Sequence, residues 1–202
     1  MIKSLIFDAG RVLVTDVPLK NIAEELSQKS SMSGAELHSY LYPNEHWRKL
    51  TLGQISEDEY WEHFLEASKV DIDKKALKEK VRTALRPIAD NVKLIPLLKD
   101  RYQLAILSNH AKEWSQFMRE EFDFFQHFHQ IIFSCDVELR KPDPKIYRLI
   151  LKRLGSQPDE CLFVDDKRRN TNGAEAIGMK TITLEDTPGL RQELLSAGVK
   201  LE

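Results

Sequence analysis

Short apolar runs without polar alternation recur along the chain and restrict the folds open to it. They are rich in Ile, Leu, Val and Phe and cover residues 3–8, 102–109, 130–135, 160–166 and 180–185. Runs of this kind are typical of parallel strands that are covered on both faces. Between the last four runs lie segments of helical character, residues 111–122, 144–154 and 170–176. The alternation predicts an α/β fold, with a doubly wound, Rossmann-like parallel sheet.

The segment between the first two runs has a different character. It contains no convincing strand, but Ser33 with Glu36 and Ser56 with Glu59 have the spacing of capping boxes at helix starts. We therefore predict an all-helical domain over residues 16–86, inserted into a core domain made of residues 1–15 and 87–202. Pro96 interrupts a helical pattern over residues 91–99, so we expect a kink or a late helix start there.

Composition excludes several classes of protein. The 30 Lys and Arg residues are balanced by 32 Asp and Glu residues, so no overall basic field is present to hold a nucleic acid or an anionic membrane. No apolar stretch approaches the roughly 20 residues of a membrane span, and the first run is shorter than the apolar part of a signal peptide. We expect a cytoplasmic protein, with Cys135 and Cys161 reduced and buried. The oligomeric state is left open.

Polar residues stand where the apolar runs end. They are Asp8, Ser108 with Asn109, Ser134, and Asp165 with Asp166, and a segment RKPDP follows the third run at residues 140–144. Ligands of open parallel sheets bind beyond the carboxyl ends of the strands, so these side chains are expected to meet at one edge. The set suits phosphate chemistry. Carboxylates can act as nucleophile and hard-cation ligands, while Ser108 and Lys141 can hold phosphate oxygens.

Four segments in order resemble the motifs of the haloacid dehalogenase superfamily of aspartate-nucleophile hydrolases. They are FDAGRVLV at residues 7–14, LSN at 107–109, RKPDPKIY at 140–147 and FVDDKRRNTNGAEAIGM at 163–179. The resemblance covers essentially the whole chain and is to the branch with a helical cap inserted after the first motif. Within that branch, the sequence looks closest to small bacterial sugar-phosphate phosphatases and to the phosphatase-like domain of epoxide hydrolases.

The resemblance implies a role for each residue at the strand ends. Asp8 would attack phosphorus and form an aspartyl-phosphate, and Mg²⁺ would be held by the Asp8 carboxylate, the Gly10 carbonyl oxygen and Asp166. Ser108 and the backbone beside Asn109 would bind the phosphoryl group.

Further roles lie around this centre. Lys141 would offset the negative charge of nucleophile and phosphate. Asp165 and Asn170 would orient Lys141 or water molecules on the metal. Substrate contacts are expected from Trp47 and Arg48 in the cap, although Trp47 could instead pack between the cap helices, and from Arg11 in the core.

Gly10 departs from the family pattern. Phosphatases of the family normally carry an Asp at this position, which protonates the leaving group and then activates water. Three hypotheses follow: a phosphatase that needs less protonation or takes its acid from elsewhere, a 2-haloacid dehalogenase, and a non-catalytic protein that binds a metabolite or partner. Because Mg²⁺ binding needs the Asp165 and Asp166 pair and dehalogenases work without a metal, we predict a Mg²⁺-dependent phosphatase of a small phosphorylated metabolite, with a sugar phosphate as the expected substrate.

Other polar residues near the motifs have two interpretations each. His110, directly after the second motif, is expected to be an exposed loop residue, with a proton relay as the alternative. The basic run at residues 167–169 would either attract an anionic substrate or form a solvated helix start.

Overall fold

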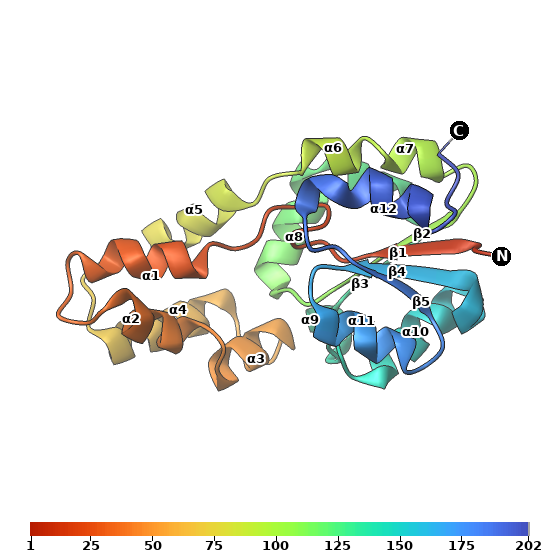
Figure 1. Ribbon diagram of the computed structural model, residues 1–202. Coiled ribbons are helices and arrows are strands. Elements are labelled where there is room, and N and C mark those ends of the chain that lie inside the picture. Colours follow the sequence, from red (N-terminus) through yellow and green to blue (C-terminus); the bar gives the residue numbers. More distant parts are fainter. Residues whose placement is uncertain (202) are drawn as a thin grey trace.

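The computed structural model describes residues 1–201, so residue 202, the last of the expected core domain, lies outside it. A five-stranded sheet forms the centre of the molecule, with strands β1 (Ser4–Phe7), β2 (Gln103–Ser108), β3 (Gln130–Phe133), β4 (Cys161–Asp165) and β5 (Lys180–Thr183). All neighbouring pairs are parallel and the order is β3-β2-β1-β4-β5, with β1 in the middle (Figure 1). Each predicted strand is present.

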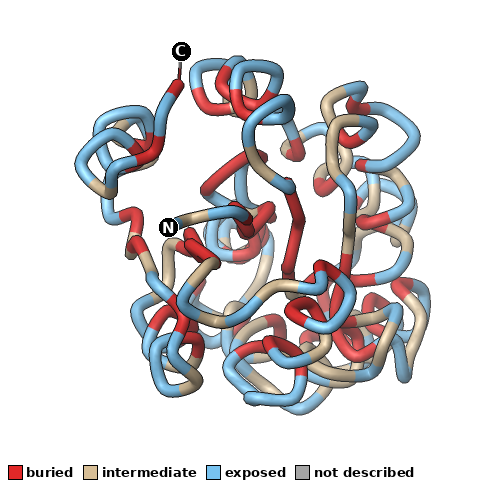
Figure 2. The backbone as a smooth tube through the Cα atoms, turned by 90° about the vertical axis from the view of Figure 1, so that its right-hand side faces the viewer, coloured by how far each residue is buried: buried red, intermediate tan, exposed pale blue. Residues whose placement is uncertain are grey.

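Helices cover both faces of this sheet (Figure 1). On one side lie α6 (Ala89–Val92), α7 (Ile95–Leu98), α8 (Lys112–Glu121) and α12 (Leu190–Ser196), and on the other lie α9 (Ser134–Val137), α10 (Pro144–Leu154) and α11 (Arg168–Glu175). Short 3₁₀ helices span Asp123–His127, Pro158–Glu160 and Thr187–Gly189. The strands are buried almost throughout, with a separate apolar cluster on each face (Figure 2). The predicted doubly wound α/β fold is confirmed.

An all-helical body follows β1 and stands beside the carboxyl ends of the strands (Figure 1). It consists of α1 (Leu19–Ser27), α2 (Gly34–Leu41), α3 (Glu45–Thr51), α4 (Glu57–Ser68) and α5 (Lys74–Ala84). Ser33 and Ser56 form the predicted capping boxes at the starts of α2 and α4. The inserted helical cap is thus present, while its boundaries at residues 16 and 86 remain a prediction.

Some local features differ from the expectation. The pattern over residues 91–99 is divided between α6 and α7. Pro96 lies in the first turn of α7, where backbone N–H groups have no partner within the helix, so its missing N–H costs the helix no hydrogen bond. Of the two free cysteines, Cys161 is buried but Cys135 is only half-buried, because it lies at the edge where β3 passes into α9. None of the helices within residues 1–201 has the length and apolar character needed to cross a bilayer.

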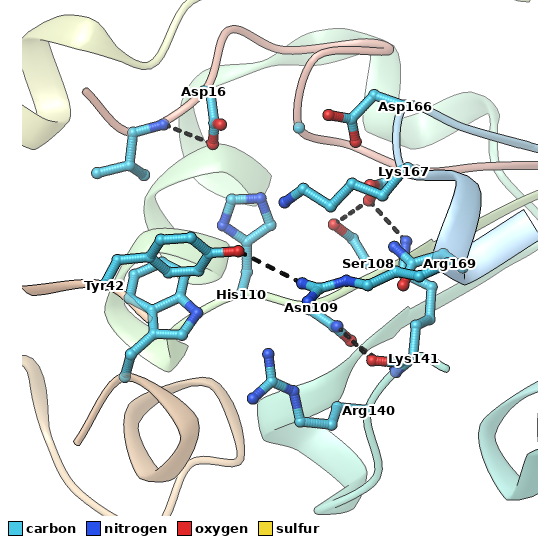
Figure 3. A pocket seen from close by; sticks show the side chains of 15 residues that line it. Asp16, Tyr42, Ser108, Asn109, His110, Arg140, Lys141, Asp166, Lys167 and Arg169 are labelled. Atoms are coloured by element: carbon cyan, nitrogen blue, oxygen red, sulfur yellow. Dashed lines mark hydrogen bonds and ion pairs between the residues drawn. The ribbon is translucent and has the colours of Figure 1, made fainter. Parts of the chain in front are cut away.

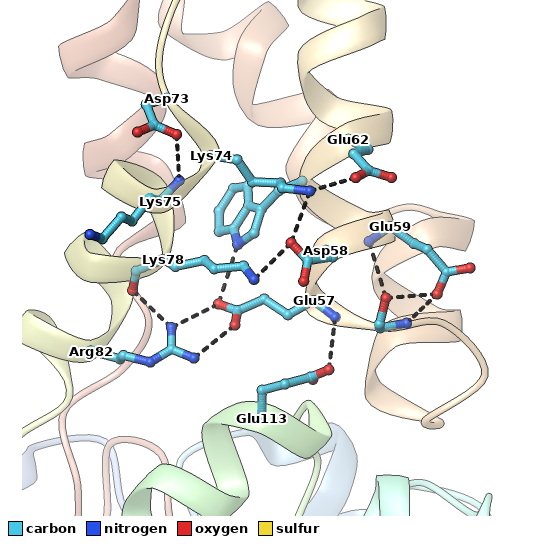
Figure 4. Close-up of polar contacts among 12 residues, drawn as sticks. Glu57, Asp58, Glu59, Glu62, Asp73, Lys74, Lys75, Lys78, Arg82 and Glu113 are labelled. Carbon is cyan, nitrogen blue, oxygen red and sulfur yellow. Dashed lines mark hydrogen bonds and ion pairs between the residues drawn. The ribbon is translucent and has the colours of Figure 1, made fainter.

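A buried carboxylate connects the cap to the core. Glu57, at the start of α4, accepts hydrogen bonds from Trp114 Nε1 in α8 at 2.7 Å and from Trp61 Nε1 at 3.3 Å. Arg82 of α5 donates to its other oxygen at 2.9 Å (Figure 4). These contacts join two cap helices, α4 and α5, to the core helix α8.

Candidate active site

Asp8 lies at the centre of the carboxyl edge of the sheet. It directly follows β1, whose Phe7 is in register with Ile106 of β2, so Ser108 at the end of β2 reaches it across the strand pair. The Asp8 Oδ1 atom accepts hydrogen bonds from the Ser108 hydroxyl at 2.5 Å and from the Ala9 N–H at 2.8 Å. Asp8 is only 6% exposed, so these donors hold its carboxylate in one orientation.

The Lys141 ammonium is buried between two carboxylates. It lies 3.0 Å from Asp8 Oδ1 and 2.5 Å from Asp165 Oδ2. Burial lowers the pKa of Lys141, but the charges of Asp165 and Asp8 outweigh this effect and raise it, so the ammonium stays charged. The Asn109 side chain bonds to the backbone N–H and C=O of Lys141 at 2.9 and 3.0 Å. Asn109 therefore uses its side chain to position the Lys141 loop.

The Asp165 carboxylate accepts hydrogen bonds from three residues. Besides the Lys141 ammonium, it accepts from the Lys167 N–H at 2.8 Å and from Asn170 Nδ2 at 2.9 and 3.0 Å. Burial is the main cause that raises the pKa of Asp165, and the charge of Asp8 adds to it. This geometry places Asp165 and Asn170 beneath Lys141, in a position to orient it.

Asp166 completes a cluster suited to a hard cation. One carboxylate oxygen from each of Asp8, Asp165 and Asp166 lies within 4.8 Å of the other two. Burial raises the pKa of Asp166 to about 6, and the charges of Asp8 and Asp165 contribute. Carboxylate oxygens are the ligands that Mg²⁺ prefers, and a cation would relieve this crowding of like charges. The donor set fits the metal, and because Lys141 contacts Asp8 and Asp165, Asp166 is the carboxylate of the three that is not paired with Lys141.

Arg11 does not line the cleft that opens over Asp8. Its Nε atom lies 3.3 Å from Asp166 Oδ2, and its backbone has a φ of +59°, in the left-handed region that non-glycine residues rarely adopt. The structure therefore places the Arg11 guanidinium on a predicted metal ligand, outside the space expected for substrate.

The space beside Gly10 faces two side chains. A Cβ added at Gly10 would lie 3.7 Å from His110 Nε2 and 3.8 Å from Asp16 Oδ1, which is ordinary van der Waals contact. The expectation that His110 is exposed is wrong: it is 5% exposed, with its ring 5.8 Å from that of Phe133. Burial lowers the pKa of His110 to about 4, and the charges of Lys141 and Lys167 act in the same direction against that of Asp16. The imidazole is therefore neutral near pH 7.

His110 is buried because its backbone and neighbours are tied to both domains. Its N–H donates to the Ser134 hydroxyl at 3.1 Å, and that hydroxyl donates to the Thr51 carbonyl oxygen at the end of α3. Sequence reasoning noted Ser134 as a strand-end residue but gave it no partner. His110 thus lies where the core edge meets the cap, with Phe133 of the core against its ring.

The cap closes one side of the cleft with aromatic residues. Trp47 lines the cleft, as expected for substrate contact, and also packs with its ring centroid 5.8 Å from that of Trp114. Tyr42 packs edge-on against Trp47 at 5.3 Å and accepts from Arg169 Nη2 at 3.4 Å (Figure 3). Arg48 lies in an adjoining hollow that shares Tyr42, Trp47 and Arg169 with the cleft.

Sequence reasoning missed Tyr42, Asp16 and Arg140 as cleft residues. For Arg140 the signal was available, since it precedes Lys141 in the third motif. Of the basic run, Lys167 and Arg169 line the cleft, whereas the Arg168 side chain points to Glu185 at 3.4 Å. Nothing in the local sequence marks Tyr42 or Asp16.

With this geometry established, comparison with known proteins decides the family. The family model for haloacid dehalogenase-like hydrolases matches residues 15–184. The chain belongs to this family. The resemblance found in the motifs is thereby confirmed, and the protein is a haloacid dehalogenase-like hydrolase.

Relatives within the family include phosphatases. The chain is 28% identical over 200 residues to a sesquiterpene phosphatase of Aspergillus oryzae, covering 95% of this chain and 94% of that one. It is 26% identical over 156 residues to the chloroplast flavin mononucleotide hydrolase 1 of Arabidopsis thaliana, covering 77% of this chain and 63% of the relative. The chain thus spans less than two thirds of the length of the second protein.

Solved structures share the fold. A haloacid dehalogenase-family enzyme from Bacteroides thetaiotaomicron, in complex with magnesium and inorganic phosphate, superposes with a TM-score of 0.76. The two chains are 20% identical, and the match covers 91% of this chain and 94% of the other. At that identity the likeness shows the common architecture of sheet and helical cap.

Proposed function

We propose that the protein is a Mg²⁺-dependent phosphomonoester hydrolase of a small phosphorylated metabolite, with a sugar phosphate as the expected class of substrate. The observation that carries this proposal is the environment of Asp8, whose carboxylate contacts Ser108 and Lys141 beside the carboxylate of Asp166. A nucleophile, a hydroxyl donor, a buried cation and a hard-cation site in contact are the parts that phosphoryl transfer needs.

In the first step an Asp8 carboxylate oxygen attacks phosphorus, and the bond from phosphorus to the leaving oxygen breaks. An aspartyl-phosphate and an alcohol result, the departing oxygen taking its proton from water in the cleft. In the second step water attacks the aspartyl-phosphate, which frees the Asp8 carboxylate and releases inorganic phosphate. Ser108 and Lys141 are placed to donate hydrogen bonds to the phosphoryl oxygens, and the charge of Lys141 offsets the negative charge that gathers on Asp8 and phosphate.

Mg²⁺ would be held by the Asp8 carboxylate, the Gly10 carbonyl oxygen and Asp166, and when bound it would neutralise and polarise the phosphoryl oxygens. Asn170 lines the same cleft, and its Oδ1 atom is buried without a hydrogen-bond partner among residues 1–201. A buried acceptor of this kind suits a water molecule of the metal site.

Two observations favour a phosphatase over the other hypotheses. The three-carboxylate cluster is of use to a metal enzyme, whereas a dehalogenase would gain nothing from crowding these charges. The sesquiterpene phosphatase and the flavin mononucleotide hydrolase add support by their names. The absence of an acid at Gly10 keeps the non-catalytic hypothesis as the competitor that an experiment must address.

The test is release of inorganic phosphate from p-nitrophenyl phosphate and a panel of sugar phosphates, with Mg²⁺ and with EDTA. We expect activity that requires Mg²⁺ and falls by at least about 10³-fold in Asp8→Asn, because the nucleophile is removed. Asp90→Asn, at an 81% exposed side chain, is the matched control. If wild type and Asp8→Asn release phosphate alike, the proposal is wrong, and turnover of 2-chloropropionate in EDTA would identify a dehalogenase instead.

A further inference from the structure

Three arginines from separate parts of the chain gather at the mouth of the cleft. Arg140 belongs to the loop before α10, Arg169 to α11 and Arg48 to α3 of the cap, and all three line one hollow that continues into the cleft over Asp8. In Figure 3 the guanidinium groups of Arg140 and Arg169 reach toward the side of the cleft where Tyr42 lies. We call this set the arginine wall.

The arginine wall is only weakly balanced by carboxylates, since Glu45 and Asp143 line the same hollow but only Glu45 pairs with one of its arginines. Within residues 1–201, no Asp or Glu oxygen lies within 4.0 Å of Arg140 or Arg169, and the single ion pair of Arg48 is with Glu45 at 3.4 Å. Both partners of that pair are more than half exposed, so it is screened and weak. Burial lowers the pKa of Arg140, and the positive charges of Arg169 and Arg48 lower it further, against Tyr42 and Glu45. Like charges held together in this way are stabilised by a bound anion.

The reacting phosphate does not account for the arginine wall. Its cation is Lys141, which is 2% exposed and lies between Asp8 and Asp165 at the floor of the cleft. Arg140 directly precedes Lys141 in the chain, but its guanidinium reaches toward the side of the cleft where Tyr42 of the cap lies (Figure 3). The cleft therefore has one cationic site at its floor and a second at its mouth.

The arginine wall is also too local for a polyanion. Arg168, between Lys167 and Arg169 in the sequence, lies 3.4 Å from Glu185 and does not line either hollow. The net charge of −2 leaves no wider basic field. Such a confined set of guanidinium groups suits one small anionic group, which arginine binds through two parallel hydrogen bonds.

We infer that the substrate carries a second anionic group, a phosphate or a carboxylate, which the arginine wall binds while the reacting phosphate lies at Asp8. This inference rests on the proposed function and narrows its substrate class from phosphate monoesters in general to those with two anionic ends. Tyr42 and Trp47 would contact the part of the substrate that joins the two ends.

The test uses binding, so that it does not depend on turnover. Wild-type protein with Mg²⁺ is titrated by calorimetry with alkylphosphonates, bisphosphonates and phosphonocarboxylates of matched and increasing chain length. At one length or more, we expect a two-anion ligand to bind at least about tenfold more tightly than its alkylphosphonate, which is about 1.4 kcal/mol. A preference for bisphosphonates assigns a second phosphate, and one for phosphonocarboxylates assigns a carboxylate.

Variants connect the preference to the arginine wall. In Arg140→Gln with Arg169→Gln, the ratio of the two dissociation constants should fall to about one, whereas Arg153→Gln, at an exposed site on α10, should keep it. Equal binding of one-anion and two-anion ligands by the wild type at all lengths overturns the inference, as does a preference that survives in the double variant. Failure of the proposed function would show separately, as a lack of phosphate release with any substrate.

Discussion

Lys141 and Asp165 form an ion pair of 2.5 Å in which both side chains are almost completely buried. A buried pair with good geometry is expensive to break from one side, because the remaining charge stays in a poorly solvating environment. Lys141→Met should therefore lower the free energy of unfolding by about 3–5 kcal/mol in EDTA, since Asp165 and Asp8 then face each other without a cation.

A double variant separates this pairing from simple loss of packing. Lys141→Met with Asp165→Leu should cost less than the sum of the two single changes, because no unpaired charge remains at Asp165. Urea unfolding of all four proteins measures the coupling. Additive costs would contradict the interpretation that Asp165 serves to hold Lys141.

Gly10 offers a gain-of-function prediction. A Cβ there meets its neighbours, His110 Nε2 and Asp16 Oδ1, at 3.7 Å or more, so a side chain can begin at this position and Gly10→Asp would bring a carboxyl group close to His110. Since general acid–base catalysis typically contributes about 10²–10⁴ in rate, kcat for alkyl phosphates should rise by at least about tenfold. The rise should be smaller for p-nitrophenyl phosphate, whose leaving group needs little protonation.

Gly10→Asn is the control for this change, because it has the same shape but no carboxyl group. If both variants alter the rates equally for both kinds of substrate, the acid–base interpretation of this position is wrong.

The sheet was predictable because each strand is an uninterrupted apolar run, and burial on both faces leaves such a run few alternatives. The residues around Asp8 were predictable for a related reason. Parallel strands bring their carboxyl ends to one edge of the sheet, so Ser108 and Asp165 must lie near Asp8. Boundaries were less certain, as the division of α6 from α7 at Lys93 and Leu94 shows.

What the sequence could not reveal comes from the cap. His110 is a loop residue by local pattern, but it is buried where the core meets the cap, with its N–H on Ser134 and the Ser134 hydroxyl on Thr51 at the end of α3. Tyr42 and Arg169 belong to one wall of the cleft through a contact between residues 127 positions apart. No periodicity encodes such a meeting, since it depends on how one domain stands on another.

The burial of His110 predicts a pH dependence of stability. Its pKa is about 4 in the folded protein against an ordinary 6.5, so the unfolded chain binds the proton more readily between these values. The stabilisation is complete above pH 6.5 and is lost as the pH falls toward 4, up to about 3 kcal/mol. Urea unfolding in EDTA should show a smaller loss between pH 7 and pH 4.5 in His110→Gln than in the wild type. Parallel pH profiles of the two proteins would argue against a neutral, buried imidazole.

The hydrogen bonds of Glu57 allow a prediction of how strongly the cap is held to the core. The Glu57 side chain is 1% exposed and accepts from Arg82, Trp61 and Trp114, so Glu57→Ala leaves the partly buried Arg82 guanidinium and two indole N–H groups without their acceptor. We expect a loss of about 2–3 kcal/mol in the free energy of unfolding, because the indole N–H groups lose a buried acceptor while Arg82 keeps some access to water. Glu57→Gln, which keeps an acceptor oxygen but not the charge, should lose less.

Two of the three tryptophans donate to this carboxylate, so their fluorescence reports the contact directly. A shifted emission in folded Glu57→Ala, absent from Glu59→Ala at the neighbouring exposed capping box, would locate the effect at the junction of cap and core. Unchanged emission together with unchanged stability would mean that this carboxylate does not hold the cap in place.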